Sequence, residues 1–466
     1  VGSMAAQTRS FAEGFLNFVD SSPTAFHAVD ECRRRLVAAG FQALREGESW
    51  ALAVGKSYFF TRNQSTIVAF TVGQKYAPGN GFKIVAAHTD SPHFKVKPRS
   101  AMNEKSGYNC IGVECYGGGI WHTWFDRDLT VAGRVIAEAA PGKFEQRLVH
   151  IKRPIMRIAS LAIHLNREVN DAMKFNKEDQ LRPIFATQVQ TALQGPGPEK
   201  GDAHHPAILA AVAKEAGVPP EAIRDFELGV VDCQPSTIGG LHEEFIYAPR
   251  LDNLMSCYVS LQGMLDAGTP ESLANDPDIR VIAFFDHEEV GSASSQGAAS
   301  SLLRATMQRI TRHFSTDATP TDAHDCALRR SFLVSMDMAH AVHPCYSSKH
   351  EENHAPAMHK GVVIKTNQNQ RYATNAQTAF AFREVARRLD IPTQDFVVRN
   401  DSACGSTIGP ILASNTGMRT IDIGIPQLSM HSVREMCGID DVSSCRQLTA
   451  GFFNLYREID DSLQVD

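Results

Sequence analysis

The chain has 466 residues, of which 43% are hydrophobic and 21% are charged, a composition typical of a globular protein with a sizeable core. Its formal net charge of −6 is mild and it contains no basic run, so nucleic acid is not an expected partner. No apolar stretch approaches the ~18 residues that a membrane span needs, so we expect no membrane partner either.

The cysteines indicate the redox environment. All ten are scattered along the chain, and no Cys-x-x-Cys pair occurs. In a chain of this length, such scattering favours reduced thiols over a disulfide framework. The first residues, "VGSMAAQTRS", lack the apolar core of a signal peptide. We therefore expect a cytoplasmic protein.

The first part of the chain changes character near residue 93. Residues 10–40 carry two helical patterns, which Pro23 interrupts. The segments "STIVAFTVG" (65–73) and "FKIVAAHTD" (82–90) then predict two strands. From about 93 to 237 the pattern is one of short strands and turns, as in "LTVAGRVIAE".

After residue 238, strands and helices alternate. The predicted strands are "RVIAFFD", "SFLVSMDM", "GVVIKTN", "DFVVRND" and "RTIDIGI", and the predicted helices are "LDNLMSCYVSLQGMLD", "TNAQTAFAFREVARRL" and "TIGPILASNTG". This alternation predicts an α/β fold with a mostly parallel sheet covered by helices. If the first strands join the same sheet, residues 1–92 and 238–466 form one discontinuous domain, and 93–237 form an inserted β-rich domain.

The stretch "VIAFFDHEEVGS" places charge at the end of a buried strand. The apolar run 281–285 reads as a strand inside a parallel sheet, and Asp286, His287, Glu288 and Glu289 follow it directly. A solvated loop explains one acidic residue more easily than two adjacent glutamates. Open α/β sheets bind their ligands at this carboxyl edge, so the stretch points to a binding site.

Other segments place residues of the metal-binding type at similar positions. Each residue has an ordinary explanation alone, such as a core histidine or a helix N-cap. Together, imidazole and carboxylate groups at the ends of several strands suit a binuclear zinc site. The residues are His88 and Asp90 in "IVAAHTD", Asp252 in "APRLDNL", Glu288 and Glu289, Asp337 and His340 in "FLVSMDMAH", and His431 in "IPQLSMHS".

The adjacent glutamates allow a division of labour. A metal hydrolase needs one carboxylate to hold the ion and a second to take a proton from the attacking water. Neighbouring residues at a strand end point in different directions, so Glu288 and Glu289 can divide these roles. Asp90 lies two residues beyond His88, where its carboxylate can accept the second ring N–H of that histidine.

At these residues the sequence resembles the aspartyl aminopeptidases of the M18 metallopeptidase family. The resemblance runs in order over nearly the whole chain. Its motifs are "AAHTDSP", "GGGIWHTWFDRDL", "LAIHLNR", "APRLDN", "DHEEVGS", "DMAHAVHP", "KHEENHAPAMHKGVVIKTNQNQRYATN", "NDSACGSTIGPILAS" and "PQLSMHSVREM".

The resemblance implies a role for each candidate. It implies two zinc ions per subunit, one site being open to another divalent metal. The ligands would be His88, Asp252 and Asp337 for one ion, and Asp252, Glu289 and His431 for the other. Glu288 would be the general base and Asp90 the residue that orients the histidine. The substrate pocket would contain His340, Lys365 and Tyr372, and His164 would reach the site of a neighbouring subunit.

The resemblance also implies an architecture and an activity. The fold would be a zinc-peptidase-type mixed sheet covered by helices, with the insert serving dimerisation within a tetrahedral dodecamer. The activity would be release of an unblocked N-terminal aspartate or glutamate from peptides. One alternative is a related co-catalytic zinc hydrolase, either a broader aminopeptidase or a deacylase. Another is a catalytically silent scaffold, but a silent relative should lack a ligand or the base, and here all are present.

Overall fold

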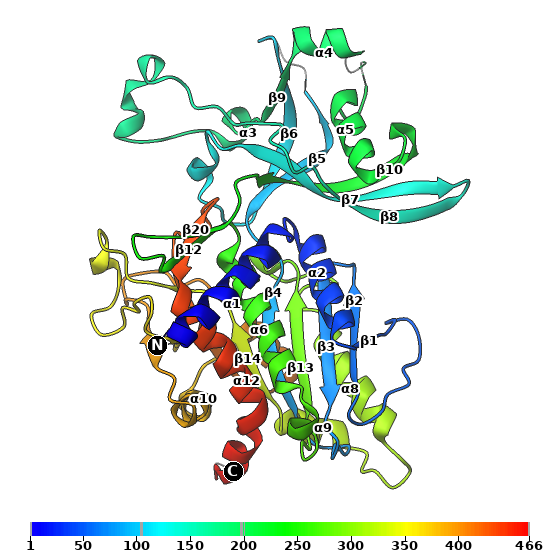
Figure 1. Ribbon diagram of the computed structural model, residues 1–466, viewed down its shortest axis with the longest axis vertical. Coiled ribbons are helices and arrows are strands. Elements are labelled where there is room, and N and C mark those ends of the chain that lie inside the picture. The colour runs from blue at the N-terminus through cyan, green and yellow to red at the C-terminus, as the bar shows by residue number, and fades with distance from the viewer. Residues whose placement is uncertain (1, 103–105, 196–198, 200, 465–466) are drawn as a thin grey trace. The chain divides into compact units, whose positions relative to one another are not determined.

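The computed structural model describes residues 2–102, 106–195, 199 and 201–464 (Figure 1). The chain divides into two compact units. The first unit consists of Val1–Asp90, Ser236–Met430 and Glu435–Asp466, and the second of Ser91–Pro235 and His431–Arg434.

The first unit is built on a nine-stranded mixed sheet. Its strand order is β1-β2-β3-β13-β4-β14-β18-β16-β17. Neighbours among β13, β4, β14 and β18 run parallel, whereas β3 and β16 run antiparallel to this group. The strands are β1 (Gln42–Ala43), β2 (Ser57–Arg62), β3 (Thr66–Val72), β4 (Phe82–His88), β13 (Ile279–Phe285), β14 (Phe332–Met336), β16 (Val362–Lys365), β17 (Thr393–Phe396) and β18 (Arg419–Gly424).

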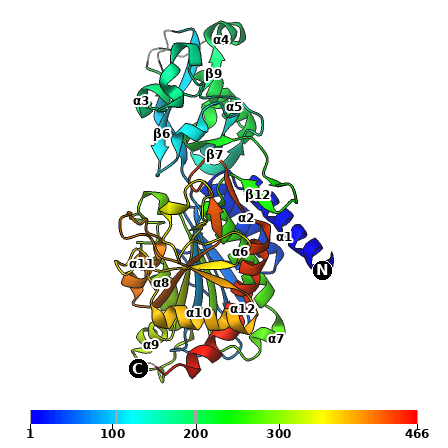
Figure 2. The same cartoon turned by 90° about the vertical axis from the view of Figure 1, so that its left-hand side faces the viewer.

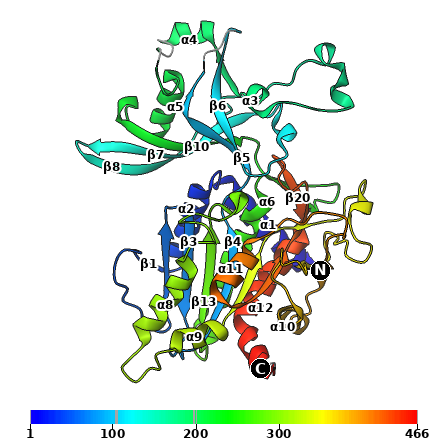
Figure 3. The same ribbon diagram turned by 180° about the vertical axis from the view of Figure 1, so that it is seen from behind.

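Helices cover both faces of this sheet. Strands β4, β13 and β14 are buried along their whole length, which is why they read as continuous apolar runs rather than alternating ones. Figure 2 shows α6 and α12 on one side of the strands and α8 and α11 on the other, and Figure 3 gives the view from behind. The longer helices are α1 (Gly2–Asp20), α2 (Ala25–Ala38), α6 (Leu251–Ala267), α8 (Leu302–Phe314), α10 (Ala376–Arg388), α11 (Ile408–Thr416) and α12 (Ile439–Ser462), and the shorter ones are α7 (Pro270–Leu273) and α9 (Ala323–Arg329).

Alternate residues of the central strands supply the two cores. Val85 and Ile282 pack in the cluster that contains residues of α1, α2, α6, α10 and α12. Their chain neighbours Ile84 and Val281 pack in the cluster that contains residues of α8, α9 and α11. The period of two along a strand therefore gives each helical layer its own apolar surface.

A smaller sheet in the same unit carries one of the predicted site residues. Its order is β11-β12-β20-β19-β15. The strands are β11 (Thr237–Gly239), β12 (Phe245–Ala248), β20 (Glu435–Gly438), β19 (Pro426–Leu428) and β15 (Ala339–His340). His340 pairs with Gln427 and thereby takes its place at the edge of this sheet.

The second unit is β-rich. Six antiparallel strands lie in the order β8-β7-β10-β5-β6-β9, over a core that includes Phe94, Trp121 and Trp124. Its elements are β5 (His93–Ala101), β6 (Tyr108–Tyr116), β7 (Leu129–Ala140), β8 (Lys143–His150), β9 (Ile184–Thr187), β10 (Ile223–Asp232), α3 (Lys177–Gln180), α4 (Gln188–Gln194) and α5 (Pro206–Ala216). The predicted class, a mixed α/β sheet with a β-rich insert, is confirmed.

One predicted strand differs from the structure. The pattern "DFVVRND" predicts a strand over 395–401, but β17 covers Thr393–Phe396 and stops there. Among the described strands its one neighbour is β16, whose last residue, Lys365, pairs with Phe396. Because β16 ends at this pair, the chain beyond Phe396 leaves the sheet and enters a loop.

Among the helices in the described part of the chain, we find none with the length and apolar character needed to cross a membrane. All ten cysteines lie in that part, and no disulfide joins them.

Candidate metal centre

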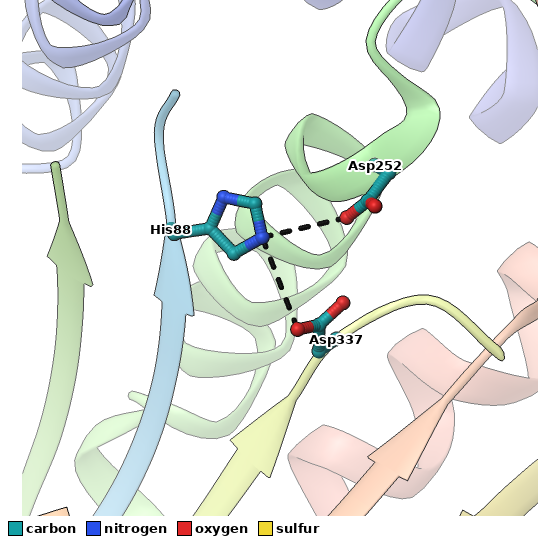
Figure 4. A group of neighbouring side chains, drawn as sticks. All are labelled: His88, Asp252 and Asp337. Atoms are coloured by element: carbon teal, nitrogen blue, oxygen red, sulfur yellow. Dashed lines mark ion pairs between the residues drawn. The ribbon is translucent and has the colours of Figure 1, made fainter. Parts of the chain in front are cut away.

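Three buried side chains converge at the carboxyl edge of the large sheet (Figure 4). His88 ends β4, Asp337 follows β14 directly, and Asp252 is the second residue of α6. The Nε2 atom of His88 lies 3.4 Å from Asp252 Oδ1 and 3.9 Å from Asp337 Oδ2. Because β4 and β14 are parallel neighbours, their ends bring the histidine and the aspartate to the same edge.

Asp252 lies at a kink near the start of α6. Its backbone (φ −81°, ψ 106°) and that of Asn253 (φ −126°, ψ 25°) are not helical. The backbone N–H of Asp252 donates to Glu435 Oε2 at 2.9 Å. The next residue, Asn253, donates from Nδ2 to the Met336 carbonyl at 2.8 Å. These two hydrogen bonds fix the backbone of Asp252 and the side chain of Asn253 beside the site.

The two glutamates follow β13 in a tight turn. They lie in a short 3₁₀ segment (Glu288–Val290) that is flanked by His287 at φ 65° and Gly291 at φ 96°. Glycine adopts this left-handed conformation at little cost, which lets the chain reverse beside the site. Glu288 Oε2 lies 3.8 Å from His88 Nε2, and ligand atoms of His88, Glu288 and Glu289 lie within 4.8 Å of one another.

Asp90 connects the histidine to the glutamates. Its backbone carbonyl accepts a hydrogen bond from His88 Nδ1 at 3.0 Å, and its carboxylate Oδ1 lies 3.4 Å from the same nitrogen. The carboxylate also accepts the backbone N–H groups of Glu288, at Oδ1, and of Glu289, at Oδ2, both at 3.1 Å. The sequence predicts only the contact between the carboxylate and the ring, and the structure adds two amide contacts that hold the turn.

The cluster has an excess of buried negative charge. Burial, reinforced by neighbouring carboxylates, raises the pKa of Glu288 to about 8 and that of Asp337 to about 6. Burial alone would favour neutral His88, but the charge of Glu288 and its contacts with Asp252 and Asp90 raise its pKa well above the ordinary value. Carboxylates that repel one another in this way fit a divalent cation, and the imidazole and carboxylate donors are those that zinc prefers.

Lys365 is buried against the backbone of Asp337 rather than exposed to solvent. Its side chain is 2% exposed, and Nζ donates to the carbonyl oxygens of Asp337 at 2.9 Å and Met338 at 3.2 Å. The ammonium also lies 5.1 Å from the centroid of the Tyr372 ring. Burial raises the pKa of the Tyr372 hydroxyl, so the phenol stays protonated. A solvated lysine, the ordinary alternative for this strand end, is excluded.

A pocket in the first unit joins two predicted substrate residues to several that the sequence did not suggest. It has a volume of about 230 Å³ and is lined by His340, Lys349, His350, Glu351, Tyr372, Phe396, Val397, Val398, Arg399, Ser402, Ala403, Cys404 and Gly405. Phe396 ends β17, residues 397–405 lie between β17 and α11, and all belong to "DFVVRNDSACGS". The sequence signal for this wall was the crowding of Asn, Asp, Ser and Gly after an apolar run, which is typical of a loop.

Comparison with known proteins establishes the family. The sequence profile described as "Aminopeptidase I zinc metalloprotease (M18)" matches residues 18–453. The chain belongs to the M18 family. It is therefore a metallo-aminopeptidase, a hydrolase of a zinc metalloprotease family.

Relatives and solved structures of M18 enzymes cover almost the whole chain. A "Probable aspartyl aminopeptidase" of Ricinus communis is 50% identical over 98% of both chains, and the "Aspartyl aminopeptidase" of Dictyostelium discoideum is 46% identical over 96% of this chain and 97% of its own. The solved structure "Cryo-EM structure of the Ape4 and Nbr1 complex" superimposes with a TM-score of 0.97 at 45% identity, covering 100% of this chain and 89% of the other. A second, "Structure of S. cerevesiae mApe1 dodecamer", gives 0.84 at 29% identity, covering 97% and 98%.

Two predicted residues of this M18 aminopeptidase belong to its second unit. His431 follows Met430, the last residue of this segment of the first unit, and Nδ1 donates to the Gly118 carbonyl at 3.1 Å within the second unit. His164 lies in a short 3₁₀ segment (Ile163–Leu165), where Leu165 is 74% exposed. Leu161 and Ile163 are also exposed, at 60% and 43%, and a group of exposed apolar side chains can mark an interaction surface. The roles of both histidines stay predictions.

Proposed function

We propose that this M18 metallo-aminopeptidase releases unblocked N-terminal aspartate or glutamate from peptides. The observation that carries the proposal is the convergence of His88, Asp252 and Asp337 beside the Glu288–Glu289 turn. The aspartyl aminopeptidase names of relatives 44–50% identical over nearly the full chain support the acidic specificity.

Two zinc ions per subunit fit the ligand types. The first would be held by His88, Asp252 and Asp337, and the second by Asp252, Glu289 and His431, one site exchanging with another divalent metal. Bound zinc would polarise the scissile carbonyl and lower the pKa of water. The buried acidic cluster supports this assignment, because without cations its carboxylates repel one another.

Glu288 would serve as the general base. Its carboxylate would take a proton from the attacking water and deliver it to the leaving amine, a role for which a side chain needs a pKa near the working pH. Asp90 would keep Glu288 in position through the backbone amide and orient His88 through the ring nitrogen. The first function would depend on the Asp90 carboxylate and the second on its carboxylate and backbone carbonyl together.

Acidic specificity would depend on Lys365 and its neighbours. A substrate carboxylate that enters a buried pocket loses its hydration and needs a compensating cation. Lys365 supplies a positive charge that is fixed by two carbonyls and lies against the Tyr372 ring. His340, an exposed residue of the pocket wall, would contact the substrate from β15.

We further propose that residues 1–92 and 238–466 form the catalytic domain and that 93–237 mediate dimerisation within a tetrahedral dodecamer. One of the related solved structures is described as a dodecamer, which supports this assembly. His164 would then complete the site of a neighbouring subunit. A cytoplasmic location remains part of the proposal.

Metal analysis combined with a substrate panel tests the proposal. The purified enzyme is assayed on Asp-, Glu-, Leu- and N-acetyl-capped chromogenic amides, and its metal content is measured in parallel. We expect two metal ions per chain and a strong preference for the Asp and Glu amides. Preference for the Leu amide would indicate a broader aminopeptidase, and cleavage of the capped amides a deacylase. A protein that turns over none of them while holding metal would be the silent scaffold.

A further inference from the structure

Asp422 is a fully buried carboxylate in the middle of the large sheet. It lies in β18 with 0% of its surface exposed. In the antiparallel pair of β16 and β18, Asp422 stands directly opposite Lys365. Directly opposite residues point their side chains to the same face of a sheet. The acidic residue therefore shares a face with the lysine that is proposed to set acidic specificity.

The two carboxylate oxygens of Asp422 bind two different loops. Oδ2 accepts the backbone N–H of Ala373 at 2.6 Å, and Oδ1 accepts the hydroxyl of Thr407 at 2.6 Å. The backbone N–H of Asp422 donates to Thr374 Oγ1 at 2.9 Å. One residue thus anchors segment 371–375 and the segment that leads into α11.

The Asp422 carboxylate packs tightly against the first turn of α11. A Cβ atom at Gly409, in the first turn of α11, would lie 2.3 Å from Asp422 Oδ2. Thr407 is the N-cap of this nine-residue helix, so the carboxylate lies beside the positive end of the helix dipole. Glycine at position 409 is what permits this close approach.

Both anchored segments form walls of the pocket. Tyr372, which immediately precedes Ala373, lines the pocket, and the centroid of its ring lies 5.1 Å from Lys365 Nζ. Cys404 and Gly405, three and two residues before Thr407, line the same pocket. A shift at either anchor would move a wall, although Asp422 does not itself line the pocket.

We propose that Asp422 is a positioning residue for the substrate pocket, which fixes Tyr372 and the Cys404–Gly405 wall and balances the buried charge of Lys365. The chemical class of the substrate rests on the function proposed above. The positioning role rests on the contacts of Asp422 alone. Substitution should therefore weaken substrate binding more than it slows the chemical step.

The test uses the isosteric variant Asp422→Asn in the full-length oligomer. Its amide oxygen can still accept the Ala373 N–H, and its NH₂ group can donate to the Thr407 hydroxyl, so the variant mainly removes the charge. Hydrogen bonds to a charged group contribute more than neutral ones, so we expect KM on the best amide to rise at least about tenfold. We expect kcat to change by less than about threefold, metal content to stay constant, and amide hydrogen exchange to increase in 371–375 and 403–409.

Asp441→Asn is a matched control. Asp441, in α12, is 1% exposed, and its carboxylate accepts the backbone N–H groups of His359 and Gly361, at 2.6 Å and 2.9 Å. It is a buried acceptor like Asp422, but neither of its two partners lines the pocket. We expect this variant to lose thermal stability while keeping the KM of the parent enzyme.

The outcomes separate this inference from the proposed function. An unchanged KM in Asp422→Asn, or a loss of kcat that parallels loss of metal, would overturn the positioning role. A parent enzyme that prefers the Leu amide would overturn the acidic function, and the KM shift on the Leu amide would then decide the role of Asp422. If the Asn variant fails to fold, Thr407→Val provides the second measurement, since it removes one anchor and leaves the charge. We expect it to raise KM as well, and an unchanged KM would contradict the inference.

Discussion

Asp90 holds Glu288 through the backbone, because its Oδ1 atom accepts the Glu288 N–H at 3.1 Å. The other carboxylate oxygen accepts the N–H of Glu289 in the same way. The proposed base and the proposed ligand are therefore positioned by one residue, whose carbonyl also accepts His88 Nδ1. Metal binding and proton transfer should fail together when this residue changes.

Asp90→Asn should impair both functions. Asparagine offers one acceptor where the carboxylate offers two, so one of the two glutamate amides loses its partner. Residues that orient metal ligands typically contribute 10–100-fold to metal affinity or activity, and we expect a loss of about that size. Zinc titration and steady-state kinetics measure it. The control is Ser294→Ala, which removes the hydroxyl 2.8 Å from His287 Nδ1 in the same loop and should cost much less.

Substitutions of the two adjacent glutamates should have different effects. Glu288→Gln should keep both metals and lose turnover by a factor of at least about 10², the usual contribution of a general base. Glu289→Ala should lose metal from one site. Metal analysis of the two variants beside the parent enzyme checks this. Equal metal loss in both would contradict the division of labour.

Lys365→Met should erase acidic preference. The thioether keeps most of the buried stem but removes the charge, so catalytic efficiency on Asp amides should fall at least about tenfold more than on Leu amides. Since Nζ also donates to the Asp337 carbonyl, metal content must be measured in the same preparation. A uniform decline across the panel with metal retained would show that the lysine has only a structural role.

Removal of metal should make stability depend on pH. The pKa of Glu288 is raised to about 8 and that of Asp337 to about 6, so the folded apoprotein binds protons more tightly than the unfolded chain. The raised pKa of His88 acts in the same direction. Stability is therefore present on the acid side of this window and is lost as pH rises through it.

Differential scanning calorimetry of the chelated enzyme measures this effect. The pH range runs from below the Asp337 pKa of about 6 up to the Glu288 pKa of about 8. We expect Tm to fall with rising pH, and the increase in Tm on adding zinc to be largest at the alkaline end. If the Tm of the chelated enzyme rises over this range, the acidic cluster does not dominate the pH dependence of its stability.

Mixed oligomers test the assignment of His164 to a neighbour's site. Each of His164→Ala and Glu288→Gln should be almost inactive alone, because loss of a donor to the reacting oxygen costs about 10²–10³ in turnover. When both are co-expressed with different tags, a subunit with intact Glu288 can receive His164 from its partner. Purified mixed oligomers should regain activity. Verified mixed oligomers without activity would mean that His164 acts in its own chain or only supports the interface.

The sequence predicts which residues lie at the edge of the sheet, but not the contacts that hold those residues in place. Strands β4, β13 and β14 were predictable because burial on both faces leaves continuous apolar runs, and the residues that end them stand out by charge. The convergence of His88 with Asp337 then follows from parallel pairing. A search for charge at strand ends could not show that the Asp90 carboxylate also binds two backbone amides, because those donors lie about 200 residues away in the chain.

Lys365 and Asp422 show more clearly what the sequence pattern does not predict. Each has a charged side chain in or beside a short apolar strand, a pattern that normally indicates a solvent-facing position. Both are buried, because their partners are carbonyls, amides and hydroxyls from loops that no periodicity predicts. Likewise β17 ends at Phe396 because its neighbour ends, which a local pattern cannot reveal.

The position of β4 in the sheet has a consequence for biosynthesis. This strand lies between β13 and β14, which the ribosome makes roughly 190 and 245 residues later, delays of about 10–50 s at ordinary rates of translation. Throughout that interval the β2–β3 hairpin can form, but β4, an apolar strand with both edges open, has no native neighbour. Unpaired strand edges invite aggregation. Synthesis of the inserted segment therefore lengthens the interval before the strand that carries His88 meets its neighbours. We expect the nascent chain to need chaperones, or early folding of the insert, during that interval.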